Sequence, residues 1–257
     1  MKPAPFAYER PGSLAEACAL LAEGGAKLLA GGQSLGPMLN LRLVQPEMLV
    51  DLAGLDELKA SERLVDGARL GALVTHAQIE DGRAPDPTGG ILPRVACGIA
   101  YRAIRNRGTV GGSLAHADPA ADWLTVLAAL GATAIVTGAD GERRVPVAEF
   151  ATGAFETVLG EAEILAAVAI PTVAAGARWG YVKIARKPGE FADAMAAVLR
   201  DPERDVERVV VGATHGAPII VEDFSEAVLA ESLARFDPIA RRLCRAAVRR
   251  ALAEADA

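Results

Sequence analysis

The chain has 257 residues, of which 51% are hydrophobic, and its formal net charge is −6. This length and apolar content predict one or two domains with a substantial core, and the negative charge with scattered basic residues argues against nucleic-acid binding. No apolar run is long enough for a membrane span and the first residues lack a signal-peptide core, so we expect a cytoplasmic protein.

The first part of the chain predicts a helix, a strand and a glycine-rich turn. Ser13 and Glu16 form the pattern of a capping box for a helix over residues 13 to 23. Residues 26 to 30 predict a strand, and a helix is expected from Pro37 to Arg42.

Between that strand and that helix lies the first glycine-rich segment, residues 30 to 35, with the sequence Ala-Gly-Gly-Gln-Ser-Leu. Gly31 and Gly32 let the backbone approach a ligand, and Gln33 and Ser34 add donors at a helix N-terminus, which favours an anion. Taken alone, a Gly-Gly pair is most often only a turn.

The middle of the chain alternates hairpins with helices. Asp66-Gly67 and Asp140-Gly141 predict hairpin turns within residues 57 to 72 and 133 to 147. A capped helix is expected to begin near Thr75, and another to run from about Leu92 to Arg105. Hairpins and helices without a regular βαβ repeat predict an α+β fold.

The second glycine-rich segment, residues 107 to 122, contains Gly108, Gly111 and Gly112 around hydroxyl side chains. Asp118-Pro119 resembles an N-cap followed by proline at the first helical position, so we expect a loop with free N–H groups and then a helix ending at Gly131. Neither segment is a Rossmann fingerprint or a P-loop.

The C-terminal part predicts a separate unit. Residues 165 to 170 form a strand pattern that ends at Pro171, where we place a domain boundary. Strands are expected at residues 179 to 185 and 209 to 214, followed by an amphipathic helix over residues 238 to 253. The arginines of that helix (Arg241, Arg242, Arg245, Arg249 and Arg250) are expected to face solvent or a partner.

Three cysteines, Cys18, Cys97 and Cys244, are far apart and surrounded by apolar residues. They are expected to be buried free thiols, so the chain should hold no disulfide, metal ion or iron–sulfur cluster of its own.

The two glycine-rich segments, with Tyr181 to Ala192 as a third element, resemble the FAD-binding medium subunit of the molybdenum hydroxylases, the family of carbon monoxide dehydrogenase and xanthine dehydrogenase. The resemblance implies a two-part FAD-binding domain of the PCMH type over residues 1–171, with subdomains of about 1–55 and 56–171. A smaller α+β domain would follow over residues 172–257. Glu190 departs from the family pattern, where aspartate is common.

The resemblance also implies which residues contact FAD. The matching positions are Leu28, Leu29, Ala30, Gly31, Gly32, Gln33, Ser34, Leu35, Thr109, Gly111, Gly112, Ser113, His116, Asp122, Leu165 and Lys183. The glycines and serines would surround the pyrophosphate, mainly through backbone N–H groups.

Some of these residues have structural alternatives. Asp122 could serve only a helix dipole, Lys183 could be an exposed strand lysine, and His116 could be a structural link rather than a hydrogen-bond partner of FAD. Phe191 could cover the isoalloxazine ring or lie in the core. His76 and His215 are expected to be structural.

The implied function is electron transfer. A large molybdenum-cofactor subunit would hydroxylate the substrate and a small [2Fe-2S] subunit would pass electrons to the FAD of this chain, in a heterohexamer of two heterotrimers. The chain would supply no catalytic residue, because the flavin carries the redox chemistry. The alternatives are a self-contained FAD-dependent oxidase or reductase, and a flavin-free scaffold.

Overall fold

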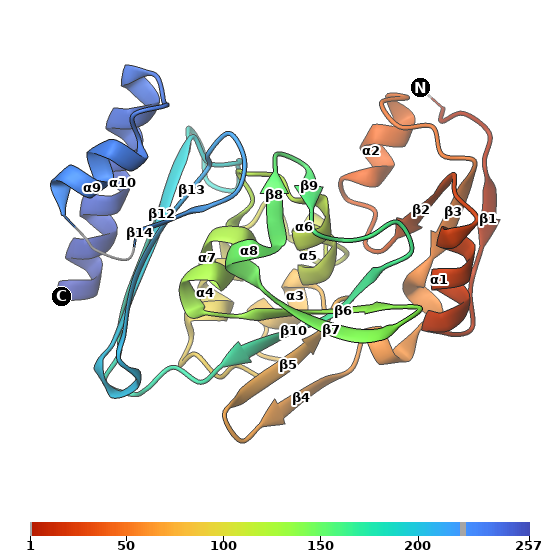
Figure 1. Ribbon diagram of the computed structural model, residues 1–257, viewed down its shortest axis with the longest axis horizontal. Helices are drawn as coiled ribbons and strands as arrows, with labels where there is room; N and C mark the ends of the chain where they lie inside the picture. The colour runs from red at the N-terminus through yellow and green to blue at the C-terminus, as the bar shows by residue number, and fades with distance from the viewer. Residues whose placement is uncertain (1, 222–224) are drawn as a thin grey trace.

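The computed structural model describes residues 2–221 and 225–257. Three bodies follow one another along the chain, each built on its own sheet, and the central body lies between the other two (Figure 1). Helices and antiparallel sheets predominate, which confirms the α+β class. No helix within the described residues is long and apolar enough to cross a membrane.

The N-terminal body contains a three-stranded parallel sheet that the sequence did not predict. Its strands are β1 (Ala7–Glu9), β3 (Met48–Asp51) and β2 (Ala26–Leu29), paired in that order. Parallel neighbours need crossover connections, and these contain α1 (Leu14–Ala22) and α2 (Leu35–Asn40). Two short 3₁₀ turns, Leu52–Gly54 and Asp56–Leu58, follow.

Ser13 caps α1 as predicted, because its hydroxyl accepts a hydrogen bond from the Glu16 N–H at 3.1 Å. The Glu16 carboxylate bonds to the N–H of Gly12 at 2.6 Å rather than to Ser13. One half of the predicted capping box is therefore formed, whereas the bond expected from the Ser13 N–H to Glu16 is replaced by one from the N–H of Gly12, one residue earlier.

The central body contains a five-stranded antiparallel sheet that includes both predicted hairpins. Its strands, in spatial order, are β4 (Ser61–Leu64), β5 (Gly67–Gly71), β10 (Ile164–Pro171), β6 (Thr133–Gly138) and β7 (Gly141–Pro146). The helices are α3 (His76–Glu80), α4 (Ile91–Cys97), α5 (Arg102–Arg105), α6 (Val110–His116), α7 (Asp122–Leu130) and α8 (Val147–Phe150). A small hairpin, β8 (Ala151–Gly153) and β9 (Glu156–Thr157), completes this body.

The helix predicted from Leu92 to Arg105 is broken into two. After α4 the backbone turns at Ala100, whose φ of 45° lies in the left-handed region, before α5 begins. Cys97 lies at the end of α4 and is exposed, which corrects the prediction that all three thiols are buried. Cys18 and Cys244 are buried as expected.

The second glycine-rich segment is a helix rather than the predicted loop. Thr109 is the N-cap of α6, and its hydroxyl accepts from the Gly112 N–H at 3.0 Å. Val110 and Leu114 lie one turn apart and are fully buried, so the segment has an apolar helical face. Asp118 bonds to the N–H of Ala120 in a turn, and α7 begins later, at Asp122.

The C-terminal body is a four-stranded antiparallel sheet covered on both faces. Its strands are β11 (Arg178–Ile184), β12 (Ala194–Asp201), β13 (Val206–Gly212) and β14 (Ile219–Val221), with a 3₁₀ turn at Pro202–Arg204. Helices α9 (Glu226–Ser232) and α10 (Pro238–Asp256) lie on the outer face, and α7 packs on the inner face (Figure 1). The sequence did not predict β12, because it is buried on both faces and does not alternate.

The arginines of α10 divide into two groups. Arg242, Arg249 and Arg250 are exposed, as expected. Arg245 instead pairs with Glu226 of α9, and Arg241 donates to the carbonyls of Ala234 and Phe236. Part of the basic run therefore joins α10 to α9.

His76 is a buried structural histidine. Its Nδ1 accepts a hydrogen bond from the Trp123 indole N–H at 3.1 Å, and its backbone N–H donates to Gly108 O at 2.9 Å. Burial, aided by the charge of Arg105, lowers the pKa of His76 to about 4. The folded protein thus keeps this ring neutral near neutral pH.

This lowered pKa predicts a pH-dependent stability. Because the unfolded state binds a proton near pH 6.5 and the folded state only near pH 4, stability is complete above pH 6.5 and falls as the pH drops toward 4. Between about pH 7 and about pH 5, the loss due to His76 should be about 2 kcal/mol. Urea unfolding at both values should show a smaller loss for His76→Asn, and equal losses in variant and parent would contradict the prediction.

Candidate functional site

The two glycine-rich segments, far apart in sequence, lie against each other. A Cβ on Gly31 would overlap the carbonyl oxygen of Arg107 and lie 3.0 Å from the Cα of Gly108. The Arg107 Nε also donates to Gly31 O at 3.4 Å. Only glycine allows this approach of the two backbones, so Gly31 joins the N-terminal body to the central body.

The first segment presents unused donors. Within residues 2–221 and 225–257, no protein group accepts from the backbone N–H of Gly32, Gln33 or Ser34, and the Ser34 hydroxyl makes no capping bond. The φ of +70° at Gly32 turns the chain there. Three neighbouring N–H groups and a hydroxyl are therefore available to an anion.

The second segment has no such free N–H groups at its helix start. The N–H groups of Val110 and Gly111 donate to carbonyls of Val74 and Ala72, at 3.0 Å each. Those of Gly112 and Ser113 both donate to Thr109. The predicted loop of free donors is thus wrong for these four positions, since the helix start is anchored to the chain around β5.

The two glycines of α6 have different neighbours. A Cβ on Gly111 would collide with Ala72, lying 2.7 Å from its carbonyl oxygen. A Cβ on Gly112 would lie 2.8 Å from the Thr109 hydroxyl and 3.6 Å from the Cβ of Ala30. Gly111 therefore allows α6 to pack, whereas Gly112 faces the first segment.

A cleft of about 520 Å³ opens beside the contact between the two segments. Its lining combines residues of both segments with basic and small side chains: Ala30, Gly31, Ala53, Lys59, Leu73, Thr75, Ala77, Gln78, Arg83, Asn106, Arg107 and Thr109. A second hollow of about 420 Å³ shares Lys59, Gln78 and Arg83 with it. Of the basic side chains that line the cleft, Lys59 pairs with Asp56 and Arg83 with Asp81. Arg107 is the lining residue best placed to attract a negatively charged ligand.

Asp122 and Lys183, predicted separately, form a buried ion pair. The Lys183 Nζ lies 3.0 and 3.1 Å from the two carboxylate oxygens, and the Tyr181 hydroxyl donates to Oδ1 at 2.7 Å. Asp122 is 4% exposed and the Lys183 side chain 15%. Lys183 is thus no exposed strand lysine, and Asp122 does more than serve a helix dipole.

Tyr181 is a member of this cluster that the sequence analysis missed. It lies two residues before Lys183 on β11, so the two side chains share one face of the strand, and this alternation could have revealed it. Burial, followed by the charge and hydrogen bond of Asp122, raises the pKa of Tyr181 well above its ordinary value. The phenol therefore stays protonated and donates to the carboxylate.

The other predicted residues lie in several environments. Leu28 and Leu29 belong to β2, and Leu35 begins α2. Leu165 is a core residue of β10, the strand that packs against α6. His116 ends α6 with its ring centroid 5.1 Å from that of Phe155, and burial lowers its pKa.

Phe191 lies on the loop between β11 and β12 and is 63% exposed, so it is not a core residue.

The predicted site residues form two groups in the structure. The first consists of Ala30, Gly31, Thr109 and Gly112, and the second of Asp122 and Lys183.

Comparison with known proteins identifies relatives over nearly the whole chain. Residues 4–173 match the family described as the FAD binding domain in molybdopterin dehydrogenase. The carbon monoxide dehydrogenase medium chain of Hydrogenophaga pseudoflava is 36% identical over 85% of this chain and 77% of its own. The nicotine 6-hydroxylase medium subunit of Paenarthrobacter nicotinovorans is 37% identical over 84% and 77%.

The fold is also that of a solved relative. A structure of carbon monoxide dehydrogenase from Hydrogenophaga pseudoflava superimposes with a TM-score of 0.90 and 30% identity, covering 99% of this chain and 98% of that chain.

The contact at Gly31 predicts a difference between two glycines of similar sequence position. Gly31→Ala should weaken FAD binding at least about tenfold, because its methyl group forces the two segments apart. Gly36→Ala is the matched control, since a Cβ there meets no atom within 4 Å. Fluorescence titration with FAD should separate the two variants, and equal affinities would refute this role of Gly31.

Proposed function

Since this chain belongs to the family of FAD-binding domains of molybdopterin dehydrogenases, we propose that it is the electron-transferring FAD subunit of a molybdenum-containing hydroxylase or dehydrogenase. It is an FAD-binding oxidoreductase subunit related to carbon monoxide dehydrogenase medium chains. The observation that carries the proposal is the row of N–H groups at residues 32–34 that have no acceptor among the described residues, in a segment held against the second one by Gly31.

The residues present fit a dinucleotide. The FAD pyrophosphate is a dianion, and the N–H groups of Gly32, Gln33 and Ser34 are donors without a protein acceptor in the described chain. The hydroxyls of Ser34 and Ser113 would add donors from the two segments. In this proposal Gly111 and Thr109 shape the site by anchoring α6, and Gly112 leaves room beside Ala30.

Lys183 would contact the cofactor through its remaining donor. An ammonium group has three N–H donors, and Asp122 can occupy at most two of them through its two oxygens. Asp122 and Tyr181 would thus orient Lys183 toward FAD. Bound FAD would take up electrons and pass them to an external acceptor, while the chain binds and orients it.

The remaining predicted contacts stay part of the proposal. They are Leu28, Leu29, Leu35, His116 and Leu165. His116 would act as a neutral ring, because burial lowers its pKa.

The proposed domain division is 1–171 and 172–257, with subdomains of about 1–55 and 56–171. Each of the three sheets lies within one of these ranges. The first two parts share a core cluster that includes Val50, Leu58, Leu73 and Ile164, which supports treating them as one FAD-binding domain.

The proposed partners are a large molybdenum-cofactor subunit and a small [2Fe-2S] subunit, assembled as two heterotrimers. The two relatives described above are named a medium chain and a medium subunit, which implies larger and smaller companions in those proteins. The cysteines of this chain lie on α1, at the end of α4 and on α10, so they are not gathered as cluster ligands. The cytoplasm remains the predicted location.

The proposal predicts noncovalent FAD that is reduced only through the complex. Acid precipitation should release the flavin, and the flavin of the co-expressed complex should be bleached when the substrate of the molybdenum subunit is added. The isolated, FAD-loaded chain should oxidise no aldehyde, purine or alcohol, because electrons reach its flavin only through the partner subunits. Turnover by the isolated chain at the rate of the complex, or flavin retained in the pellet, would instead support a self-contained flavoenzyme.

A further inference from the structure

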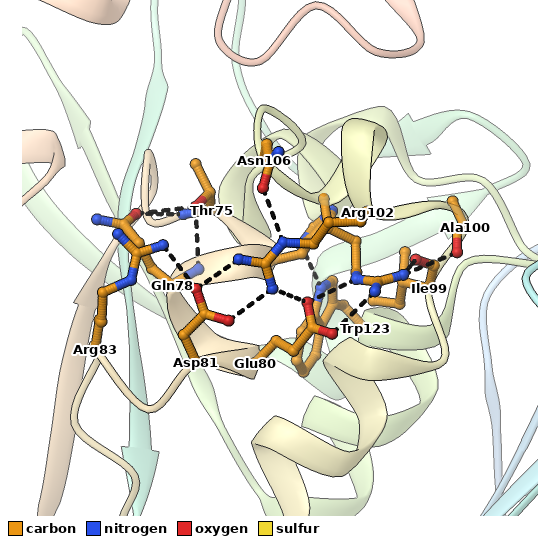
Figure 2. A network of polar contacts seen from close by, with 12 residues as sticks. Thr75, Gln78, Glu80, Asp81, Arg83, Ile99, Ala100, Arg102, Asn106 and Trp123 are labelled. Carbon is orange, nitrogen blue, oxygen red and sulfur yellow. Dashed lines mark hydrogen bonds and ion pairs between the residues drawn. The ribbon is translucent and has the colours of Figure 1, made fainter.

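A network of charged side chains joins α3 to α5 in the central body (Figure 2). Glu80 and Asp81 at the end of α3 face two arginines of α5, and the network extends to the carbonyls of Ile99 and Ala100. The two arginines differ in what they hold. Among the described residues, the guanidinium of Arg102 bonds to side chains alone, whereas that of Arg105 also bonds to backbone carbonyls between α4 and α5.

Arg105 uses its whole guanidinium group. Its Nε and Nη2 bond to the two oxygens of Glu80 at 2.8 and 2.9 Å. Its Nη1 donates to the carbonyls of Ile99 and Ala100, both at 2.9 Å. Arg105 is 9% exposed. Its hydrogen bond is the main cause that lowers the pKa of Glu80, so the Glu80 carboxylate stays charged at neutral pH.

These bonds hold a strained piece of backbone. Ala100 has a φ of 45°, a conformation that costs free energy for a residue with a Cβ unless its surroundings impose it. Two charge-assisted hydrogen bonds from Arg105, to the carbonyls on either side of the Ala100 Cα, supply that constraint.

The same stretch of backbone contacts the β11–β12 loop, residues 185–193, and we call Ile99 and Ala100 the seat of this loop. Ile99 pairs with Gly189 as a parallel bridge, and a Cβ on Gly189 would lie only 3.0 Å from Ala100 O. The loop follows Lys183 on β11 and bears the exposed Phe191. The loop therefore begins two residues after the proposed FAD contact of the C-terminal body, Lys183.

We propose that Arg105, oriented by Glu80, is a positioning residue for FAD: it fixes the Ile99–Ala100 seat of the β11–β12 loop and thereby sets how tightly the cofactor is retained. The inference rests on the proposed function, since it requires FAD beside Lys183. Arg105 itself does not contact the cofactor, and lysine cannot replace it because an ammonium lacks the planar fork that serves two carbonyls and a carboxylate together.

The test compares FAD dissociation from three variants of the FAD-loaded full chain. Arg105→Lys should raise the dissociation rate about tenfold, since it loses the bonds to the seat. Arg102→Lys is the matched control on the same helix, because Arg102 is exposed and pairs with Glu80 and Asp81 but not with the seat, and its rate should change less than about twofold. Gly189→Ala disturbs the same contact from the loop side, because a Cβ there would crowd Ala100 O and the φ of +83° disfavours any side chain, so it should also speed FAD dissociation.

Iodide quenching of the flavin provides a second readout that general stability does not move. In Arg105→Lys and Gly189→Ala the flavin should become more accessible to iodide, with Tm of the apoprotein recorded beside it. Parental dissociation and quenching in both variants, or equal effects of Arg105→Lys and Arg102→Lys, would overturn the inference. If Arg105→Lys fails to fold, Glu80→Gln takes its place, because it removes the carboxylate that orients Arg105 and should also speed FAD dissociation. A parent chain that holds no FAD would instead refute the proposed function.

Discussion

The backbone contact between Gly31 and Arg107 is the constraint on which the candidate site depends. Because no side chain separates the two backbones, the first glycine-rich segment is held against the cap of α6, and its N–H groups at residues 32–34 find no acceptor in residues 2–221 and 225–257. The second segment is the one that is anchored to the rest of the protein, because its first N–H groups donate to Val74, Ala72 and Thr109. The second segment thus bonds to the protein through its first N–H groups, whereas the first segment does not, although both are rich in glycine and hydroxyl side chains.

Much of this arrangement could be predicted from sequence, and the exceptions have identifiable causes. The hairpins followed from Asp-Gly turns, and the caps at Ser13 and Thr75 from local hydrogen-bonding chemistry. The helix α6 was missed because glycines at its start mask the spacing of Val110 and Leu114, and glycine is a poor helix former unless packing requires it. The close contact of Gly111 with Ala72 is that packing requirement, and it is visible only in three dimensions.

Contacts that are visible only in three dimensions also explain what the sequence could not predict about the candidate site. Asp122 and Lys183 were each identified through the family resemblance, but their pairing across two bodies depends on how β11 lies against the start of α7. Strand alternation would have added Tyr181, whereas no local pattern predicts that Arg105 reaches back to Ile99 and Ala100. Sequence patterns reveal periodicity and helix caps. The break after α4 is instead stabilised by the side chain of Arg105 on the next helix, which bonds back to the carbonyls of Ile99 and Ala100.

Residues 99–122 of the central body contact both the N-terminal body and the C-terminal body, so this stretch links all three. Arg107 and Gly112 face the first glycine-rich segment, while Ile99 and Asp122 face the C-terminal body through Gly189 and Lys183. The contacts differ in kind, since one side depends on the absence of a Cβ and the other on a buried charge pair. A buried pair that loses one member leaves an uncompensated charge. The C-terminal sheet therefore meets the central body at a contact in which each of the two charged side chains, Asp122 and Lys183, depends on the other for its buried position.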